Sequence, residues 1–406
     1  MERTSRQLTI KYALLQSTYW ISQCTIYGFA AVYLQYNNFN NTQVGIVLSL
    51  SAILSIILQP VVSAFADKSK KKTVRNIILI LLLLGFTFAI ILNIKTKSLI
   101  FIGIVFILIN GIQFTINPLL NSYALEYLNN GYPLNFGLAR GTGSIAFAIT
   151  SFFLGHGITK FTAKIIVPFF IFSYVFLFLA AYLFRIKNTN KNNISNHSVP
   201  EKSLLVSDKD KNPPASILGF FLKYKKFTLM LLGITMLFYS HNIINTYLIN
   251  IMENVGGNSS DLGLSLTIAA ALELPTMAAF AFLIKRVKSS TLIKASAFFF
   301  MIKSLLVFIA ANVLTVHLSQ AFQMLSFALF TPASVYYVNT IINKEDRNKG
   351  QAMMGVATIG ASGTIAFITG GKLLDTRGAS HMLLIGFIVS ILGFIITCIS
   401  TEKSDL

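Results

Sequence analysis

Three charged side chains lie inside long apolar runs of this sequence: Arg140, Glu273 and Lys303. A charge at the centre of a bilayer costs about 2.5–3.5 kcal/mol on insertion scales, so we expect all three to face protein or water. The guanidinium of Arg140 is a planar fork of donors that suits a carboxylate or vicinal hydroxyl groups. Glu273 is the only acidic residue deep inside any predicted span, which makes it the expected partner of Arg140. These residues predict a buried polar site that holds hydroxyl or carboxylate groups.

A stripe of amide side chains precedes Arg140 in the sequence. Asn110, Gln113, Asn117 and Asn121 are spaced so that, at about 100° per residue, they share one face of a helix. Such a stripe either joins helices through hydrogen bonds or lines a water-filled cavity. Four amides on one face favour the cavity, with Asn117 and Asn121 as the expected lining residues.

Three other residues have two interpretations each. His241, beside Asn242, is either a structural donor or a cavity residue. Lys303 either pairs with Glu273 or extends to the membrane surface, although its distance from both loops argues against the latter. Trp20 is the only tryptophan, in a stripe with Gln16, Gln23 and Tyr27, and serves either as a stacking surface or in helix packing.

The elements that must position these residues are membrane-spanning helices. The chain has 406 residues, of which 54% are hydrophobic and only 12% charged, whereas a soluble domain has about 25% charged residues. Apolar runs of about 20 residues recur throughout, each long enough to cross a bilayer core of about 30 Å. We predict twelve spans: 11–35, 42–66, 74–94, 98–124, 138–159, 164–185, 226–251, 260–284, 291–312, 315–340, 349–371 and 380–400.

The net charge of +19 follows the positive-inside pattern, because Lys and Arg gather in alternate loops. The pattern places both termini and the long central loop in the cytoplasm, and it indicates no nucleic-acid partner. Cys24 and Cys398 fall inside predicted spans and read as small core residues. We expect a multi-pass protein of a bacterial plasma (inner) membrane whose partners are the lipid bilayer and a small polar solute.

The chain divides into two predicted six-helix halves, residues 1–185 and 219–406, joined by a polar cytoplasmic linker at 186–218. A weak internal repeat supports the division: Thr42-Gln-Val-Gly-Ile opens the second span and Ser260-Asp-Leu-Gly-Leu opens the eighth, so that Gly45 and Gly263 correspond. The expected fold class is an all-α membrane protein with twelve transmembrane helices in two halves around a midplane site, the major facilitator fold.

Several local motifs carry a family resemblance. They are Gln59-Pro60, Ala66-Asp67-Lys68, Phe136-Gly-Leu-Ala-Arg140-Gly-Thr-Gly143-Ser, and Ala271-Leu-Glu273-Leu-Pro. These segments resemble lactose permease and related oligosaccharide:proton symporters of the major facilitator superfamily. Ser240-His241 and the Gln320 region are similar to 3-phenylpropionate-type transporters. The resemblance implies that Arg140 and Glu273 hold sugar hydroxyls between the two halves, and that Asp67 belongs to a cytoplasmic gate.

The sequence departs from that family at several site positions. Asn121 stands where the family has an acid, and Phe147 where an aromatic residue, usually Trp, stacks on the sugar. Lys303 replaces an arginine and Gln323 a histidine. Because Ser326 aligns with the usual proton-carrying glutamate, Glu273 becomes the proton carrier by elimination.

The predicted function is proton-coupled uptake of a sugar or oligosaccharide by alternating access, powered by a proton gradient, without a cofactor or metal and in a monomer. The alternatives are uptake of an organic anion such as an aromatic acid, uptake of a nucleoside, drug export, or nutrient sensing without transport. An enzyme is not expected, because no metal cluster, nucleotide loop or nucleophile–base pair occurs. The predicted substrate-binding residues are Arg140, Glu273, Phe147, Asn117, Asn121, His241, Lys303 and Gln323.

Overall fold

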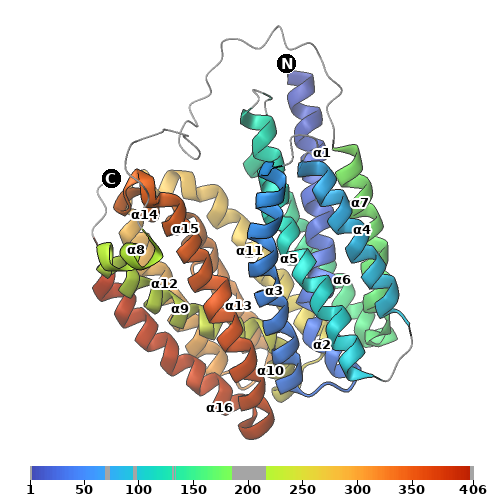
Figure 1. Ribbon diagram of the computed structural model, residues 1–406. Coiled ribbons are helices and arrows are strands. Elements are labelled where there is room, and N and C mark those ends of the chain that lie inside the picture. Colours follow the sequence, from blue (N-terminus) through green and yellow to red (C-terminus); the bar gives the residue numbers. More distant parts are fainter. Residues whose placement is uncertain are drawn as a thin grey trace.

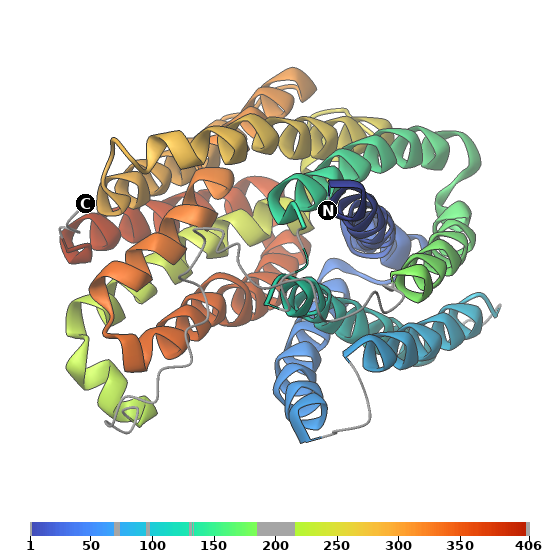
Figure 2. The same ribbon diagram turned by 90° about the horizontal axis from the view of Figure 1, so that it is seen from above.

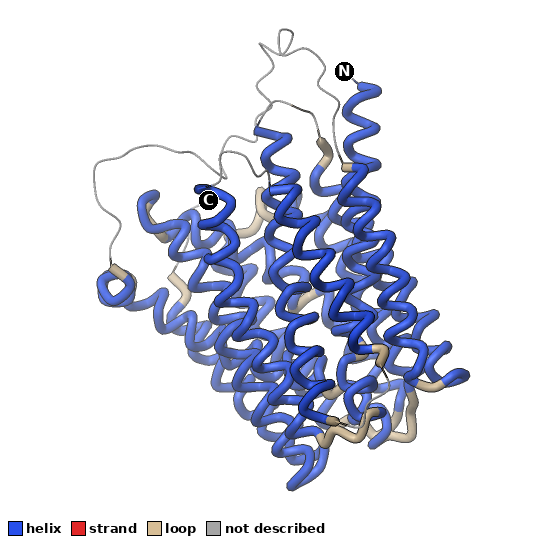
Figure 3. The backbone as a smooth tube through the Cα atoms, turned by 45° about the vertical axis from the view of Figure 1, so that its right-hand side comes forward, coloured by secondary structure: helices blue, strands red, loops and turns tan. Residues whose placement is uncertain are grey.

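The computed structural model describes residues 2–68, 74–94, 98–129, 132, 134–184 and 216–402. Within these ranges every regular element is a helix, and no strand occurs (Figure 3). The helices form two groups that lie side by side when viewed from above (Figure 2). We name them the first group, residues 2–184, and the second group, residues 216–402. Most of the predicted linker lies outside the described residues.

The first group contains the helices that correspond to the six N-terminal spans. They are α1 (Glu2–Gln23), the π-helix η1 (Cys24–Gly28), α2 (Ala30–Tyr36), α3 (Asn41–Lys68), α4 (Val74–Leu92), α5 (Leu99–Asn129), α6 (Phe136–Phe161), the 3₁₀-helix η2 (Ala163–Ile165) and α7 (Ile166–Leu183).

The second group is more fragmented. Its elements are α8 (Ile217–Lys223), α9 (Lys225–Thr246), α10 (Leu248–Asn254), α11 (Ser259–Leu283), α12 (Ser289–Phe308), α13 (Val313–Ala321), η4 (Phe322–Met324), α14 (Phe327–Ile341), η5 (Lys344–Asp346), α15 (Arg347–Gly355), the π-helix η6 (Val356–Ala361) and α16 (Ser362–Ser400).

Ten helical stretches of the described chain are long and apolar enough to cross a membrane. One of them, Lys344–Ser400, has 57 residues and holds two predicted spans, because the non-helical backbone of Gly378 (φ 78°, ψ 176°) divides it. The predicted span 11–35, which comprises parts of α1, η1 and α2, is not among the ten. Its longest helix, α1, has 22 residues but is more polar than the others. Each of the twelve predicted spans therefore corresponds to helical structure, and the protein is a multi-span membrane protein.

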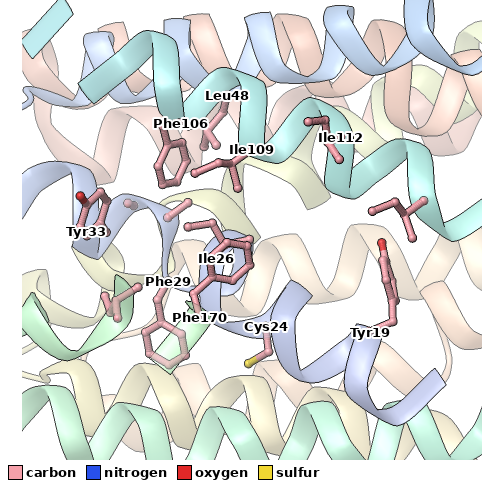
Figure 4. Packing of buried hydrophobic residues seen from close by; sticks show 14 of the residues in the cluster. Tyr19, Cys24, Ile26, Phe29, Tyr33, Leu48, Phe106, Ile109, Ile112 and Phe170 are labelled. Atoms are coloured by element: carbon pink, nitrogen blue, oxygen red, sulfur yellow. The ribbon is translucent and has the colours of Figure 1, made fainter. Parts of the chain in front are cut away.

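Apolar side chains of the first helix fill the centre of the first group (Figure 4). Phe29 and Tyr33 are buried, and the Tyr33 ring stacks on Phe106 of α5 with centroids 5.7 Å apart. Phe170 of α7 is fully buried and belongs to the same core. The first predicted span, which comprises parts of α1, η1 and α2, is thus held between α5 and α7, and this packing positions the polar side chains of α1.

The two groups touch at the end of the molecule opposite the chain termini, and they diverge toward the end that carries the termini (Figure 1). At the first crossing, α3 meets α16 backbone to backbone. A Cβ added to Gly45 would lie 2.0 Å from the carbonyl oxygen of Phe367, and one added to Gly371 would lie 2.1 Å from that of Asn41. Only glycine fits at such distances, so these residues determine how closely the helices pack.

The second crossing, between α6 and α11, repeats this arrangement. A Cβ on Gly263 would lie 2.3 Å from the carbonyl oxygen of Ser151, and one on Gly155 would lie 2.6 Å from that of Ser259. Gly45 and Gly263, which the internal repeat pairs in sequence, therefore occupy corresponding places in the two crossings. Hydroxyl groups add a hydrogen bond at the second crossing, where Ser151 Oγ lies 3.1 Å from Thr267 Oγ1.

Asp375 closes the first crossing at its outer edge. Its carboxylate accepts four hydrogen bonds from the N-terminal residues of α3: from the backbone N–H and side-chain amide of Asn41 (3.1 and 2.7 Å) and from the backbone N–H and hydroxyl of Thr42 (2.7 and 2.6 Å). A carboxylate at a helix N-terminus satisfies unpaired backbone donors and favours the helix dipole. The corresponding contact at the second crossing is uncharged, with Thr159 Oγ1 3.0 Å from Ser260 Oγ.

Candidate functional site

A hydrogen-bonded cluster joins α1 to α5. The side-chain carbonyl of Asn121 accepts from the hydroxyl of Tyr12 (3.1 Å) and from the amide of Gln16 (3.2 Å), and the same Gln16 amide donates to Tyr12 (2.6 Å). Tyr12 and Gln16 are both fully buried. Because all three side chains are neutral, the position that the family fills with an acid is here part of a neutral network.

The other three amides of the α5 stripe, Asn110, Gln113 and Asn117, differ in their hydrogen-bond partners. Gln113 donates to Ser22 Oγ of α1 at 2.8 Å, and Asn110 donates to the Phe106 carbonyl of its own helix at 3.1 Å. Asn117 is half-buried, and its Oδ1 has no hydrogen-bond partner in the described structure. Gln113 and Asn121 thus join α5 to α1 through hydrogen bonds. The side-chain oxygens of Asn110 and Gln113, like that of Asn117, have no hydrogen-bond partner in the described structure.

Arg140 lies over the ring of Trp20. Its guanidinium carbon is 4.5 Å from the ring centroid, a cation–π distance. The indole N–H of Trp20 donates to Gln16 Oε1 at 3.2 Å, which ties the ring to the neutral cluster. Arg140 is half-buried, and within the described residues no hydrogen bond or ion pair to its guanidinium is found. Its N–H donors are therefore available.

Two residues of α6 make room for the indole ring and border it. A Cβ on Gly143 would lie 2.3 Å from Trp20 Cδ1, so only glycine leaves space for the ring there. Phe147, one turn further along, meets the ring edge-on with centroids 6.1 Å apart. Arg140, Gly143 and Phe147 thus lie along one face of α6, as spacings of three and four residues require.

On the second group, Glu273, Gln323 and Lys303 form a chain. The ammonium of Lys303 donates to Gln323 Oε1 at 2.7 Å, and Gln323 Nε2 donates to Glu273 Oε1 at 3.1 Å. An ammonium group has no acceptor, so the lysine fixes the orientation of the amide and directs its donors toward the carboxylate. Lys303 is only 1% exposed, so it does not extend to the membrane surface.

Local helix irregularities surround these residues. Pro275 lies inside α11, two residues after Glu273, and removes one hydrogen bond from the helix. The tenth span breaks between α13 and α14, and Gln323 lies on the short 3₁₀-helix in that gap. Broken helices at membrane depth are tolerated where they are buried in protein, and in transporters they mark binding sites.

His241 is enclosed by aromatic rings. It stacks on Phe327 with centroids 5.5 Å apart and meets Phe300 edge-on at 5.3 Å. Its Nε2 lies 2.9 Å from the Asn245 amide nitrogen, while its Nδ1 is buried without a partner. The preceding residue, Ser240, hydrogen-bonds Ser304, the residue after Lys303, at 2.6 Å. His241 is therefore a buried neighbour of the Lys303 helix.

The expected ion pair between Arg140 and Glu273 is not formed. Among the described side chains, no nitrogen of Arg140 lies within 4.0 Å of a carboxylate oxygen of Glu273. Their helices do meet here, because a Cβ on Gly141 would lie 3.7 Å from Leu274 Cδ2. The guanidinium instead contacts Trp20 and the carboxylate contacts Gln323. Each charged group thus has a neutral partner within its own helix group.

Two further outcomes concern other predicted residues. The side chain of Asp67 lies outside the described residues, so its predicted gate role remains a prediction. Tyr12, Gln16 and Trp20 were not among the predicted site residues. The stripe of polar residues along the first span was the available signal, but the position of its partner on α5 depends on tertiary packing.

The comparisons with known proteins agree with this architecture. A family model described as "MFS_1 like family" matches residues 12–397. The chain is 22% identical over 379 residues to a maltose permease of Geobacillus stearothermophilus, covering 93% of this chain and 91% of that protein. It is 24% identical over 400 residues to the uncharacterised transporter YwbF of Bacillus subtilis, covering 96% and 94%.

Solved structures share the fold at lower sequence identity. The nucleoside transporter NupG has a TM-score of 0.75 at 13% identity and covers 97% of this chain and 98% of its own. A bacterial homologue of the human lysosomal transporter Spinster, in an inward-facing and occupied conformation, has a TM-score of 0.66 at 8% identity, with 98% and 97% covered. Since the family match extends over nearly the whole sequence, the chain belongs to the MFS_1 like family, and it is a major facilitator superfamily transporter rather than an enzyme.

Proposed function

We propose that this protein takes up a sugar or oligosaccharide together with a proton, by alternating access of two helix groups around a site between α6 and α11. The observation that carries the proposal is the pair of charged groups on facing helices, each with only neutral partners. Arg140 has N–H donors available and Glu273 has a carboxylate beside Gln323. Vicinal hydroxyl groups accept from the first and donate to the second, so one sugar ring bridges the two helix groups.

The other predicted residues complete this site. Phe147 offers an apolar surface to the ring, and Asn117 has a free carbonyl acceptor for a hydroxyl group. Asn121, His241, Lys303 and Gln323 support the charged groups. Glu273 carries the proton: its carboxylate is protonated when solute and proton enter together and ionised when they leave.

The transport cycle alternates between two packings of the helix groups. With both termini on the cytoplasmic side of a bacterial plasma membrane, the glycine crossings lie on the outer side and the described state is inward-facing. Opening to the outside separates α3 from α16 and α6 from α11, while the opposite end closes. A monomer is sufficient, because one chain supplies both helix groups.

One observation favours a second candidate, uptake of an organic anion. Arg140 and Lys303 are two cations against the one carboxylate of Glu273, and Lys303 is buried with an amide as its hydrogen-bond partner. A carboxylate solute would balance the additional positive charge. Nucleosides, whose ribose also carries vicinal hydroxyls, form the third class to be tested.

The test is external pH in a lightly buffered, de-energised suspension of cells that express the protein. Alkalinisation on addition of sugars, absent from Glu273→Gln cells, supports the proposal. Alkalinisation only with organic acids, after correction for proton release by the acid itself, favours the anion alternative. Uptake of labelled sugar without any pH change would contradict proton coupling.

A further inference from the structure

We propose that Trp20 is the positioning residue for Arg140, and that its indole ring holds the guanidinium in the place where an ion pair would otherwise hold it. The inference rests on the proposed function, in which Arg140 contacts the solute, and it assigns a role to the single tryptophan of the chain. The contact joins two helices, because Trp20 belongs to α1 and Arg140 to α6.

The neutral character of the surroundings is the first argument. Asn121, on the facing helix, cannot neutralise a cation, and its carbonyl already accepts from Tyr12 and Gln16. A guanidinium can nevertheless be held by the face of an indole, the aromatic ring that binds cations best. The guanidinium carbon lies over the indole ring, and a guanidinium that stacks on a ring by its flat face leaves the N–H donors in its plane unoccupied. A carboxylate partner would occupy those donors, and the ring leaves them for the solute.

The second argument is that the ring itself is fixed from several directions. Its N–H donates to Gln16, its edge meets Phe147, and Tyr19 packs against it edge-on with centroids 5.5 Å apart. The absent Cβ of Gly143 leaves the space for the ring. A ring held by a hydrogen bond, two aromatic neighbours and a glycine gap has little freedom to rotate, so it gives the cation a defined position.

Fluorescence of the purified protein tests the contact directly, because all tryptophan emission comes from Trp20. Iodide gathers beside a guanidinium and caesium is repelled, so iodide should quench the wild-type emission several-fold more efficiently than caesium at constant ionic strength. Arg140→Gln should bring the two quenching efficiencies close together, and Arg140→Lys should preserve part of the difference. An unchanged ratio in Arg140→Gln would overturn the proposal.

Two glycine variants on α6 separate ring position from general effects of substitution. Gly143→Ala places a Cβ 2.3 Å from the ring and should displace it, whereas Gly137→Ala adds a Cβ with nothing within 4 Å. Gly143→Ala should therefore shift the emission and reduce the iodide preference, and Gly137→Ala should leave both unchanged. Equal spectra for both variants would contradict the fixed ring position.

Transport kinetics test whether the contact serves the solute. Trp20→Phe keeps an aromatic face and Trp20→Leu does not, so the KM of Trp20→Leu should exceed that of Trp20→Phe by about 2- to 30-fold, with a smaller change in maximal rate. Equal KM values for the two variants would contradict the positioning role. If the quenching results hold but no solute is transported by the wild type, the contact stands and the proposed function fails.

Discussion

At the scale of single residues, the charged groups of this transporter are notable for their neutral partners. Arg140 lies on an indole ring and Glu273 accepts from an amide. In a direct ion pair the charges of Arg140 and Glu273 would neutralise each other, and the solute would have to break that pair in order to bind. Neutral partners keep both groups ready to exchange one hydrogen bond for another, which favours a site that binds and releases within one cycle.

The first prediction concerns these two groups. Arg140→Ala should reduce solute uptake by at least about 30-fold, because losing a charge-assisted hydrogen bond in a buried site costs about 2 kcal/mol or more. Glu273→Gln should abolish uptake because a glutamine cannot release the proton. Membrane insertion should be unchanged, since neither side chain holds helices together through an ion pair. Initial uptake rates, normalised to the amount of protein in the membrane, measure the effect. Normal accumulation by either variant would remove that residue from the site.

The second prediction concerns Gln323. Gln323→Leu leaves the ammonium of Lys303 buried without its acceptor, and it should lower the free energy of unfolding by about 1.5–3 kcal/mol, the value of a hydrogen bond to a charged group. Gln320→Leu is a matched control, because Gln320 is equally buried but donates only to Ser319 at 3.3 Å. Adding Lys303→Met to Gln323→Leu should restore the part of the stability that is lost by burying the ammonium without its acceptor, but not the part due to the Gln323–Glu273 hydrogen bond. Thermal unfolding in detergent measures all four proteins, and an equal loss in the two leucine variants would argue against the Lys303–Gln323 bond.

At the scale of elements, helix–helix crossings without intervening side chains hold the closed end together. Each crossing places a glycine of one helix against a backbone carbonyl of the other. Packing of this kind is sensitive to volume, because backbone atoms cannot move aside as a side chain can.

The third prediction follows from that sensitivity. Gly371→Val should separate α3 from α16 and open the closed end, because even a Cβ there would lie 2.1 Å from the Asn41 carbonyl oxygen. Gly355→Val, in α15 of the same group, has nothing within 4 Å of its Cβ and should leave the distance unchanged. Spin labels at the exposed positions Lys160 and Ser380, in a background without native cysteines, report the distance between the groups. No lengthening in Gly371→Val would contradict the assigned role.

The fourth prediction concerns Asp375, which lies in the exposed connection between the last two predicted spans. Partial burial raises the pKa of its carboxyl, but the hydrogen bonds from Thr42 and Asn41 outweigh burial and hold the pKa below its usual value. The ionised form is therefore favoured in the closed end, which gains stability above the ordinary carboxyl pKa and loses it as pH falls through the lowered value. The nearby titratable groups are Lys372 and Arg377 on the same helix and Tyr247, the residue between α9 and α10.

Asp375→Asn should mimic the acidic condition at neutral pH. Removal of a carboxylate from a helix N-terminus costs about 0.3–1 kcal/mol, so the closed population should fall by about 2- to 5-fold relative to the open one. The same spin-label pair measures this ratio as a function of pH. The wild-type ratio should decrease toward low pH and that of Asp375→Asn should not, and identical pH profiles would contradict a role for the carboxylate.

At the scale of the whole molecule, the fold was predictable because its main signal is local. Runs of about 20 apolar residues mark the spans, and the non-helical Gly378 falls in the predicted connection between the last two. The division of the tenth span at Gln323 was not predictable, because no glycine or proline marks that break. The correspondence of Gly45 and Gly263 was visible in sequence, and the structure gives it a physical meaning in close packing.

The candidate site was predictable in composition but not in connectivity. Arg140, Glu273 and Lys303 were identified because charges are expensive within a membrane. Their partners were not, since contacts such as Gln16 with Asn121 join residues that are 105 positions apart in sequence. Electrostatics alone pairs Arg140 with Glu273, whereas packing around Gly143 makes the indole ring the nearer neighbour.

The uncharged glycine crossings have a further consequence for the response to membrane voltage. Moving one elementary charge across a potential of 100 mV changes its energy by about 2.3 kcal/mol, but separation of backbone carbonyls and glycines moves no net charge. Asp375 lies at the exposed edge, where little of the potential falls. Any capacitive current during a single turnover should therefore arise from Arg140, Glu273, Lys303 and the transported ions. An electrical recording would report charge movement at the candidate site and not the separation of the glycine crossings.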